Sequence, residues 1–228
     1  MILAVGGVTD AAEITLLYVS PEARFGGVSR ALLAALEQRA AERGNTACHL
    51  VSSETARRFY HARGYAESGP PERRFGTSGS YPMAKNLLSI NGVKDPLPTD
   101  FATLQSEARA EGHRFLDRLA ADWASGAMRF TATGEMLLIA HAAEVVAGIG
   151  GLTRDPVMTD ALRMRRFYVR PLFRRRGIGR TIAVEVLREA ARTRLPVALN
   201  AAPRSIPFWE SLGFLSDARD GHTHLLRR

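Results

Sequence analysis

Apolar residues recur along the chain in two stretches that predict the same succession of strands and helices. In the first stretch, short apolar runs predict strands, and leucines at helical spacing predict one long helix. The expected strands are 1–5, 14–19, 47–52, 65–67 and 81–88, and the expected helices are 28–43 and 55–63. Residues 70–80 open with two prolines and are typical of a loop.

The second stretch is longer because further helices come before its strands. Helical spacing begins at Phe101, after the capping residue Asp100, breaks near Gly112 and ends at Ser125. The expected strands are 135–141, 144–152, 162–169, 196–201 and 222–226, with helices at 178–194 and 205–213. Residues 89–99 carry Asn-Gly and two prolines, which predicts a linker. We therefore expect two α/β modules, at 1–92 and 93–228.

One turn between a predicted strand and a predicted helix carries the strongest chemical signal. The strand ends at Val169, and residues 174–180 read Arg-Arg-Arg-Gly-Ile-Gly-Arg where the helix begins. Gly177 and Gly179 lack side chains, so backbone N–H groups can approach a ligand closely there. The first turn of a helix adds unpaired N–H donors, and arginine side chains suit phosphate oxygens. The turn therefore predicts a pyrophosphate-binding site.

The same pattern occurs twice in the chain. Tyr, Val, Pro, Arg, Gly and Arg recur in register at a spacing of 150 residues, in 18–30 and in 168–180. A second motif follows each copy, Phe-Tyr-His-Ala-Arg-Gly-Tyr from Phe59 and Phe-Trp-Glu-Ser-Leu-Gly-Phe from Phe208. A repeat of this length indicates two related modules.

Both motifs resemble those of the GNAT superfamily of acyl-CoA-dependent N-acetyltransferases. The first motif reads Arg174-x-x-Gly-x-Gly in one copy and Arg24-x-x-Gly-x-Ser in the other. The resemblance implies an α/β (α+β) fold in which each module has a mixed, mostly antiparallel sheet with splayed parallel central strands and flanking helices. It covers a full module at 93–228 but only the C-terminal part of one at 1–92. The first copy thus reads as N-terminally truncated, unless the chain starts further upstream.

The resemblance also implies an activity and a set of binding residues. An acetyl group would pass from acetyl-CoA, the co-substrate, to a primary amine of a small molecule or peptide by direct attack in a ternary complex. The residues expected to bind acetyl-CoA are Tyr168, Val169, Arg174, Arg175, Arg176, Gly177, Ile178, Gly179, Arg180 and Asn200. A backbone N–H near Tyr168 or Val169 could polarise the thioester carbonyl, and the Asn200 amide could bond the pantetheine arm.

The candidate catalytic residue lies in the first copy. Tyr60 stands where the family commonly has a tyrosine that protonates the leaving thiolate. Trp209 occupies the matching place in the second copy, and its indole N–H does not titrate usefully. Arg163 similarly replaces Glu13, a carboxylate that could deprotonate an amine through water. The second module therefore either lets water or another group protonate the thiolate, or has lost catalysis.

Composition narrows the partners and the compartment. The net charge of +8 could serve nucleic acid, an acidic membrane surface or an anionic cofactor, yet no nucleic-acid motif occurs and no apolar run could span a membrane. The single cysteine, Cys48, excludes an intramolecular disulfide and predicts a reducing compartment, the cytoplasm. His222 and His224 alternate as on a solvated strand, and they lack a third ligand, so no metal site is predicted.

Three functions stay open from the sequence. The first is an N-acetyltransferase whose working site lies in the second module. The second is a GNAT-fold protein that binds CoA or regulates without catalysis, as Trp209 and the truncated first copy would suit. The third, ranked last, is nucleic-acid binding through the arginine-rich face. Two incomplete copies could also pair between chains as a homodimer.

Overall fold

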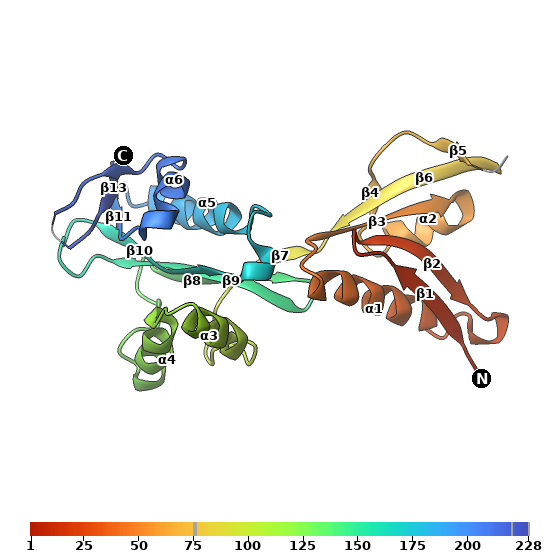
Figure 1. The fold of residues 1–228 in the computed structure, drawn as a ribbon, viewed down its shortest axis with the longest axis horizontal. Helices are drawn as coiled ribbons and strands as arrows, with labels where there is room; N and C mark the ends of the chain where they lie inside the picture. The colour runs from red at the N-terminus through yellow and green to blue at the C-terminus, as the bar shows by residue number, and fades with distance from the viewer. Residues whose placement is uncertain (75–76, 220, 228) are drawn as a thin grey trace. The chain divides into compact units, whose positions relative to one another are not determined.

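A computed structural model describes residues 1–74, 77–219 and 221–227 (Figure 1). The chain divides into two compact units. Unit 1 comprises Met1–Ser89 with His141–Val145, and unit 2 comprises Ile90–Ala140 with Val146–Arg228. No helix within the described ranges is long and apolar enough to cross a membrane.

Unit 1 is built on a mixed sheet. Its strands are β1 (Ala4–Val8), β2 (Glu13–Val19), β3 (Ala47–Ser53), β4 (Ala66–Glu67), β5 (Glu72–Arg74) and β6 (Thr77–Asn86). Its helices are α1 (Val28–Glu42) and α2 (Glu54–His61). The strand order is β1-β2-β3-β6-β4, with β5 paired to β6. β2 and β3 are parallel, and the other pairs are antiparallel.

Helix α1 shows how the sequence positions an element of unit 1. Leu33, Leu36 and Ala40 recur at helical spacing, and all three are buried. The helix ends where predicted, because Gly44 adopts a left-handed φ of 85° and Asn45 donates both its backbone and its side-chain N–H to the Ala40 carbonyl oxygen, each at 3.1 Å.

Unit 2 holds a longer mixed sheet. Its strands are β7 (Leu88–Gly92), β8 (Met136–Ala142), β9 (Val145–Arg154), β10 (Leu162–Val169), β11 (Val197–Leu199), β12 (Leu215–Ser216) and β13 (His224–Leu226). Its helices are α3 (Phe101–Ala110), α4 (Phe115–Ser125), α5 (Ile178–Ala191) and α6 (Ile206–Glu210). The strand order is β12-β13-β11-β10-β9-β8-β7.

Helices cover both faces of the unit 2 sheet. Ile149 on β9 belongs to a buried cluster that includes Leu104 of α3 and Leu116 of α4. A Cβ on its neighbour Gly150 would lie 2.8 Å from a methyl carbon of Ile182 in α5. Successive residues of a strand face opposite sides of a sheet, so α3 and α4 cover one face and α5 covers the other, as Figure 1 shows.

The predicted linker 89–99 is partly wrong. Strand β7 continues to Gly92 and pairs with β8 at the edge of the unit 2 sheet, and Val93 N–H still donates to the Leu137 carbonyl at 2.8 Å. Strand pairing overrides the turn signal of Asn-Gly because each paired residue satisfies backbone groups. The predicted loop 70–80 likewise contains β5 and the start of β6, with residues 75–76 outside the described part.

The two sheets share one order of elements. The path β1-β2-β3-β6-β4 corresponds strand by strand to β9-β10-β11-β13-β12. Each sheet has one parallel pair at the equivalent place, β2 with β3 in unit 1 and β10 with β11 in unit 2. Glu13 pairs with His49, and Arg163, the residue equivalent to Glu13 in the repeat, pairs with Ala198. The predicted fold class, α/β modules with mixed sheets flanked by helices, is confirmed.

Candidate functional site

The candidate site begins where two parallel strands part. β10 and β11 pair only at Leu162–Val197 and Arg163–Ala198. Against β9, the register of β10 shifts between Arg165 and Tyr168, a bulge that adds a residue and bends the strand. The backbone edge of β10 beyond Arg163 therefore has no ladder with β11.

The alternation of β10 decides which backbone groups face that open edge. Arg170 N–H donates to the Ala147 carbonyl of β9 at 3.0 Å. Neighbouring residues of a strand point their N–H groups in opposite directions, so Val169 N–H is directed at the open edge and Tyr168 N–H at β9. Of the two predicted backbone donors, the Val169 N–H has the suitable direction.

The predicted arginine-glycine turn forms the start of α5. After a short 3₁₀ turn at Pro171–Phe173, Arg175 adopts φ 64° and Gly177, the N-cap, adopts φ 80°. No side chain caps the helix, so the first-turn N–H groups of Ile178 and Gly179 are available to a ligand. A Cβ on Gly177 would meet nothing within 4 Å, so the left-handed backbone, not crowding by protein, calls for glycine here.

Of the four predicted arginines, Arg174 and Arg180 each donate hydrogen bonds to protein groups. Arg174 donates Nη1 to Glu111 Oε1 at 2.7 Å and Nη2 to Oε2 at 2.5 Å, and its Nε donates to the Val169 carbonyl at 2.9 Å. Arg180 Nη2 donates to Ser211 Oγ at 2.6 Å. Arg175 and Arg176, the other two, have exposed side chains next to the start of α5.

Glu111 is a site residue that the sequence analysis missed. It follows α3 and also accepts a 2.7 Å hydrogen bond from the buried Tyr168 hydroxyl. The Arg174 hydrogen bonds hold the pKa of Glu111 down at about 2, and burial together with Glu111 raises the pKa of Tyr168. The signal was available: Glu107 and Glu111 are four residues apart, as are their partners Arg170 and Arg174.

Asn200 lies just past the end of β11, on the far side of the open edge. Its side chain is exposed, and Nδ2 donates to the Gly221 carbonyl at 3.1 Å. The neighbouring Ala201 N–H donates to Thr223 Oγ1 at 2.8 Å. These two bonds fix the chain after β11 against the segment before β13.

Trp209 and Tyr60 occupy matching aromatic clusters in the two units. Trp209 in α6 is buried and makes edge contacts with Phe208 and Phe214, at centroid distances of 4.8 and 5.7 Å. Tyr60 in α2 contacts Phe59 and Tyr65 in the same way, at 5.1 and 5.7 Å. Burial raises the pKa of Tyr60. Both residues thus pack against aromatic neighbours, and Tyr60 belongs to a different unit from the predicted binding residues.

The equivalent turn of unit 1 repeats the backbone but not the charge. Gly27, the N-cap of α1, has φ 81°, and Phe25 has φ 63° where Arg175 has 64°. Phe25 is fully exposed at this position. An anion at this turn would therefore meet fewer cationic groups than at α5.

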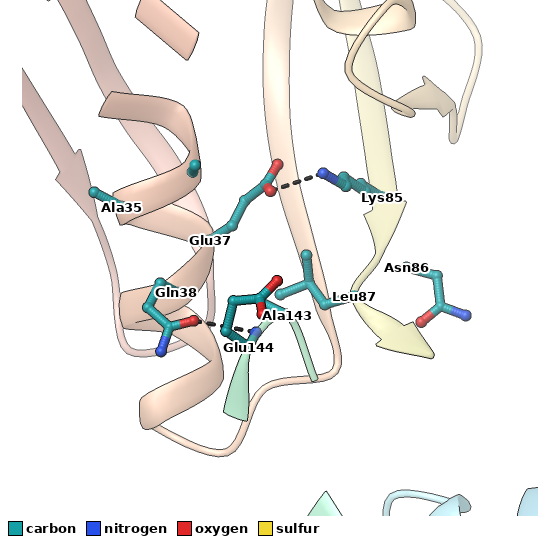
Figure 2. Close-up of a pocket in the computed structure, with 9 residues that line it drawn as sticks. Ala35, Glu37, Gln38, Lys85, Asn86, Leu87, Ala143 and Glu144 are labelled. Atoms are coloured by element: carbon teal, nitrogen blue, oxygen red, sulfur yellow. Dashed lines mark hydrogen bonds and ion pairs between the residues drawn. The ribbon is translucent and has the colours of Figure 1, made fainter. Parts of the chain in front are cut away.

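A pocket of about 420 Å³ lies elsewhere in unit 1 (Figure 2). Its residues come from α1, from the end of β6 and from the turn between β8 and β9, which holds Ala143 and Glu144. None of them is a predicted site residue. Glu37 and Lys85 face each other across it with an ion pair of 2.7 Å, and Gln38 accepts a hydrogen bond from the Glu144 N–H. Glu37 Oε2 is thus paired with Lys85, whereas Glu37 Oε1 is buried without a hydrogen-bond partner within the described residues.

The prediction of solvated histidines is wrong. His222 and His224 are only 4% and 3% exposed, and β13, which begins at His224, is paired on both sides, with β11 and β12. Within the described ranges, no group of three or more metal-ligating side chains lies together.

Comparison with known proteins gives the family. The sequence model described as "Acetyltransferase (GNAT) domain" matches residues 1–87 and 103–224. A solved protein from Exiguobacterium sp. 255-15, assigned as an acetyltransferase, is 25% identical, with 61% of this chain and 93% of that chain covered and a TM-score of 0.57. An acetyltransferase from Streptococcus agalactiae 2603 shares the fold at 19% identity, 60% and 89% coverage and a TM-score of 0.50. No curated protein matches the sequence.

The fold and the family match identify an acyltransferase of the GNAT class. Because the family model matches most of the chain, the chain belongs to the GNAT acetyltransferase family.

Proposed function

We propose that unit 2 is an N-acetyltransferase that moves an acetyl group from acetyl-CoA to a primary amine of a small molecule or peptide. The observation that carries this proposal is the start of α5, where the left-handed Gly177 and an uncapped first turn stand beside the exposed Arg175 and Arg176. Backbone N–H groups at a helix N-terminus, together with guanidinium groups, suit a diphosphate.

The open edge of β10 supports the placement of the thioester. Val169 N–H points to this edge and would donate to the thioester carbonyl oxygen, where negative charge develops as the amine attacks. Arg174 is a positioning residue, because its Nε holds the Val169 carbonyl while Glu111 holds its other nitrogens. We assign the side-chain amide of Asn200 to the pantetheine arm, across the same edge.

The reaction is a direct transfer in a ternary complex. The amine nitrogen forms a bond to the acetyl carbon and gives up one proton to water, the carbon–sulfur bond breaks, and the leaving thiolate takes a proton. In unit 2 neither Trp209 nor Tyr168 suits the role of proton donor, because the first is a buried indole and the second donates its proton to Glu111. We propose that water protonates the thiolate, and that positioning supplies most of the rate gain. Tyr60 stays the candidate donor for unit 1.

The two units are proposed to be copies of one module, of which unit 1 has the C-terminal part. Their matched strand order supports this view. A homodimer that pairs the incomplete copies is a further proposal, tested by light scattering. We place the protein in the cytoplasm because its one cysteine, Cys48, forms no disulfide, as in proteins of reducing compartments.

The test combines binding with turnover. Calorimetric titration of the full chain with acetyl-CoA should show binding, and release of CoA thiol should follow with at least one member of a panel of small amines, polyamines, amino acids and peptides. Binding without release would favour a protein that holds CoA without transferring the acetyl group. Absence of binding would contradict the proposal.

A further inference from the structure

Three of the four consecutive β10 residues 163–166 are arginines with buried or half-buried side chains. Arg163 is buried, and Arg165 and Arg166 are half-buried. Each has a buried guanidinium nitrogen without a hydrogen-bond partner: Nη2 of Arg163, and Nε of Arg165 and of Arg166. A buried cation is costly unless a counter-charge and hydrogen bonds compensate it.

Two of the three arginines have a carboxylate partner. Arg163 Nε donates to Asp155 Oδ2 at 2.6 Å, and Arg166 Nη2 donates to Asp122 Oδ2 at 2.8 Å. Both arginine side chains are only 10% exposed, so these ion pairs are shielded from water. The charges of Arg163 and Arg166 are therefore neutralised within the unit.

Arg165 has no carboxylate partner among the described residues. Its Nη1 donates only to the Met128 sulfur, at 3.8 Å, which is a weak acceptor. Burial, and then the positive charge of Arg163, lower the pKa of Arg165, although the carboxylates of Asp155, Asp122 and Glu135 oppose this shift from beyond hydrogen-bond distance. Unlike Arg163 and Arg166, Arg165 therefore makes no ion pair among the described residues.

The position of Arg165 connects it with the proposed reaction. It follows Arg163, the last residue of β10 that pairs with β11, and it precedes Val169, the proposed donor to the thioester. Arg165 and Val169 are four residue steps apart along a bulged strand, a distance of roughly 12 Å. That distance suits a small acceptor whose amine lies at the thioester and whose other end lies at Arg165.

We propose that the acceptor amine carries an anionic group, a carboxylate or a phosphate, and that Arg165 binds this group. The inference rests on the proposed acetyl transfer, because it names the acceptor class of the same site. A guanidinium group binds either anion through paired hydrogen bonds, and Nη2 of Arg165 is not among the buried nitrogens and makes no hydrogen bond within the described residues. The bound anion supplies the direct ion pair that Arg165 does not make within the described part of the chain.

The test uses matched product pairs in the presence of free CoA, so it requires no turnover. N-acetylglycine is compared with N-acetylglycinamide, and N-acetylphosphoethanolamine with N-acetylethanolamine, by thermal unfolding of the full chain. The charged member of at least one pair should raise Tm by about 2 °C or more beyond its neutral partner. The pair that responds identifies carboxylate or phosphate.

Variants assign the effect to Arg165. Arg165→Met should abolish the difference within the pair, Arg165→Lys should retain part of it, and Arg188→Met, at a 69% exposed position of α5, should behave as the wild type. Without probes, Arg165→Met should unfold at the same or a higher Tm, because a half-buried charge without an ion pair is removed. Equal effects of charged and neutral probes, or an unchanged response in Arg165→Met, would overturn the proposal. Failure to bind acetyl-CoA would instead contradict the proposed acetyl transfer. The Tm difference between charged and neutral probes would still report whether Arg165 binds an anion.

Discussion

Arg174 and Glu111 form a two-point ion pair, with Nη1–Oε1 at 2.7 Å and Nη2–Oε2 at 2.5 Å. The pair joins the turn that precedes α5 to the end of α3, and it places Arg174 Nε on the Val169 carbonyl at 2.9 Å. Arg174, the first arginine of the motif, therefore positions the backbone of the site through its hydrogen bonds to Val169 and Glu111. Arg175 and Arg176 have exposed side chains and place positive charge at the surface of the turn.

The ion pair predicts a dependence of stability on pH. The folded-state pKa of Glu111 is about 2, below the ordinary value near 4.3, so its stabilisation is complete above roughly pH 5 and is lost as the pH falls towards 2. Both side chains are about a third exposed or more, so we expect a contribution of only about 1 kcal/mol. Glu111→Gln should flatten the urea-unfolding profile between pH 5 and 2; curves parallel to the wild type would count against the pair.

Packing of α5 on β9 predicts a strong effect at one glycine. A Cβ on Gly150 would lie 2.7 Å from Phe167 and 2.8 Å from Ile182, so Gly150→Ala should cost about 1–3 kcal/mol of unfolding free energy. Gly92→Ala is the matched control, because a Cβ on that strand glycine meets nothing within 4 Å. Equal denaturation midpoints for the two variants would show that α5 does not pack as described.

Trp209 provides a test of the proton donor in unit 2. Trp209→Tyr restores the phenol common in the family and should cost about 1–3 kcal/mol, because the aromatic cluster loses volume. If the phenol reaches the thiolate, kcat should rise about tenfold. Trp209→Phe controls for the lost volume and should show no rise, as measured by thiol release. Equal rates in the two variants would mean that this position does not face the leaving sulfur.

Tyr60 provides the corresponding test in unit 1. Because Tyr60 is buried between Phe59 and Tyr65, Tyr60→Phe removes a hydroxyl and keeps the ring packing. With the working site in unit 2, kcat/KM should change less than about threefold. A loss of a hundredfold or more, the scale of a missing general acid, would move the chemistry to unit 1.

Local signals predicted the elements and the turn at α5 well. Gly177 and the arginines before it stand where their spacing indicated, since a left-handed N-cap is a local requirement. Long-range contacts could not be read in the same way. Ser89–Gly92 becomes a strand through pairing with β8, and Glu111 meets Arg174 across 63 residues of sequence. That Arg165 makes no ion pair within the described residues likewise follows only from the folded arrangement of β10 and α4, and the sequence alone does not indicate it.

The central claim is that the turn at Gly177 binds the diphosphate of acetyl-CoA. Calorimetric titration of Gly177→Glu tests it most directly, with Gly27→Glu as the matched control, because the two N-cap glycines have φ of 80° and 81° and carry the same folding penalty. We predict that Gly27→Glu binds acetyl-CoA as the wild type does, while Gly177→Glu stays folded and loses at least about a hundredfold in affinity, or about 2.7 kcal/mol. Wild-type affinity in a folded Gly177→Glu protein would contradict the claim.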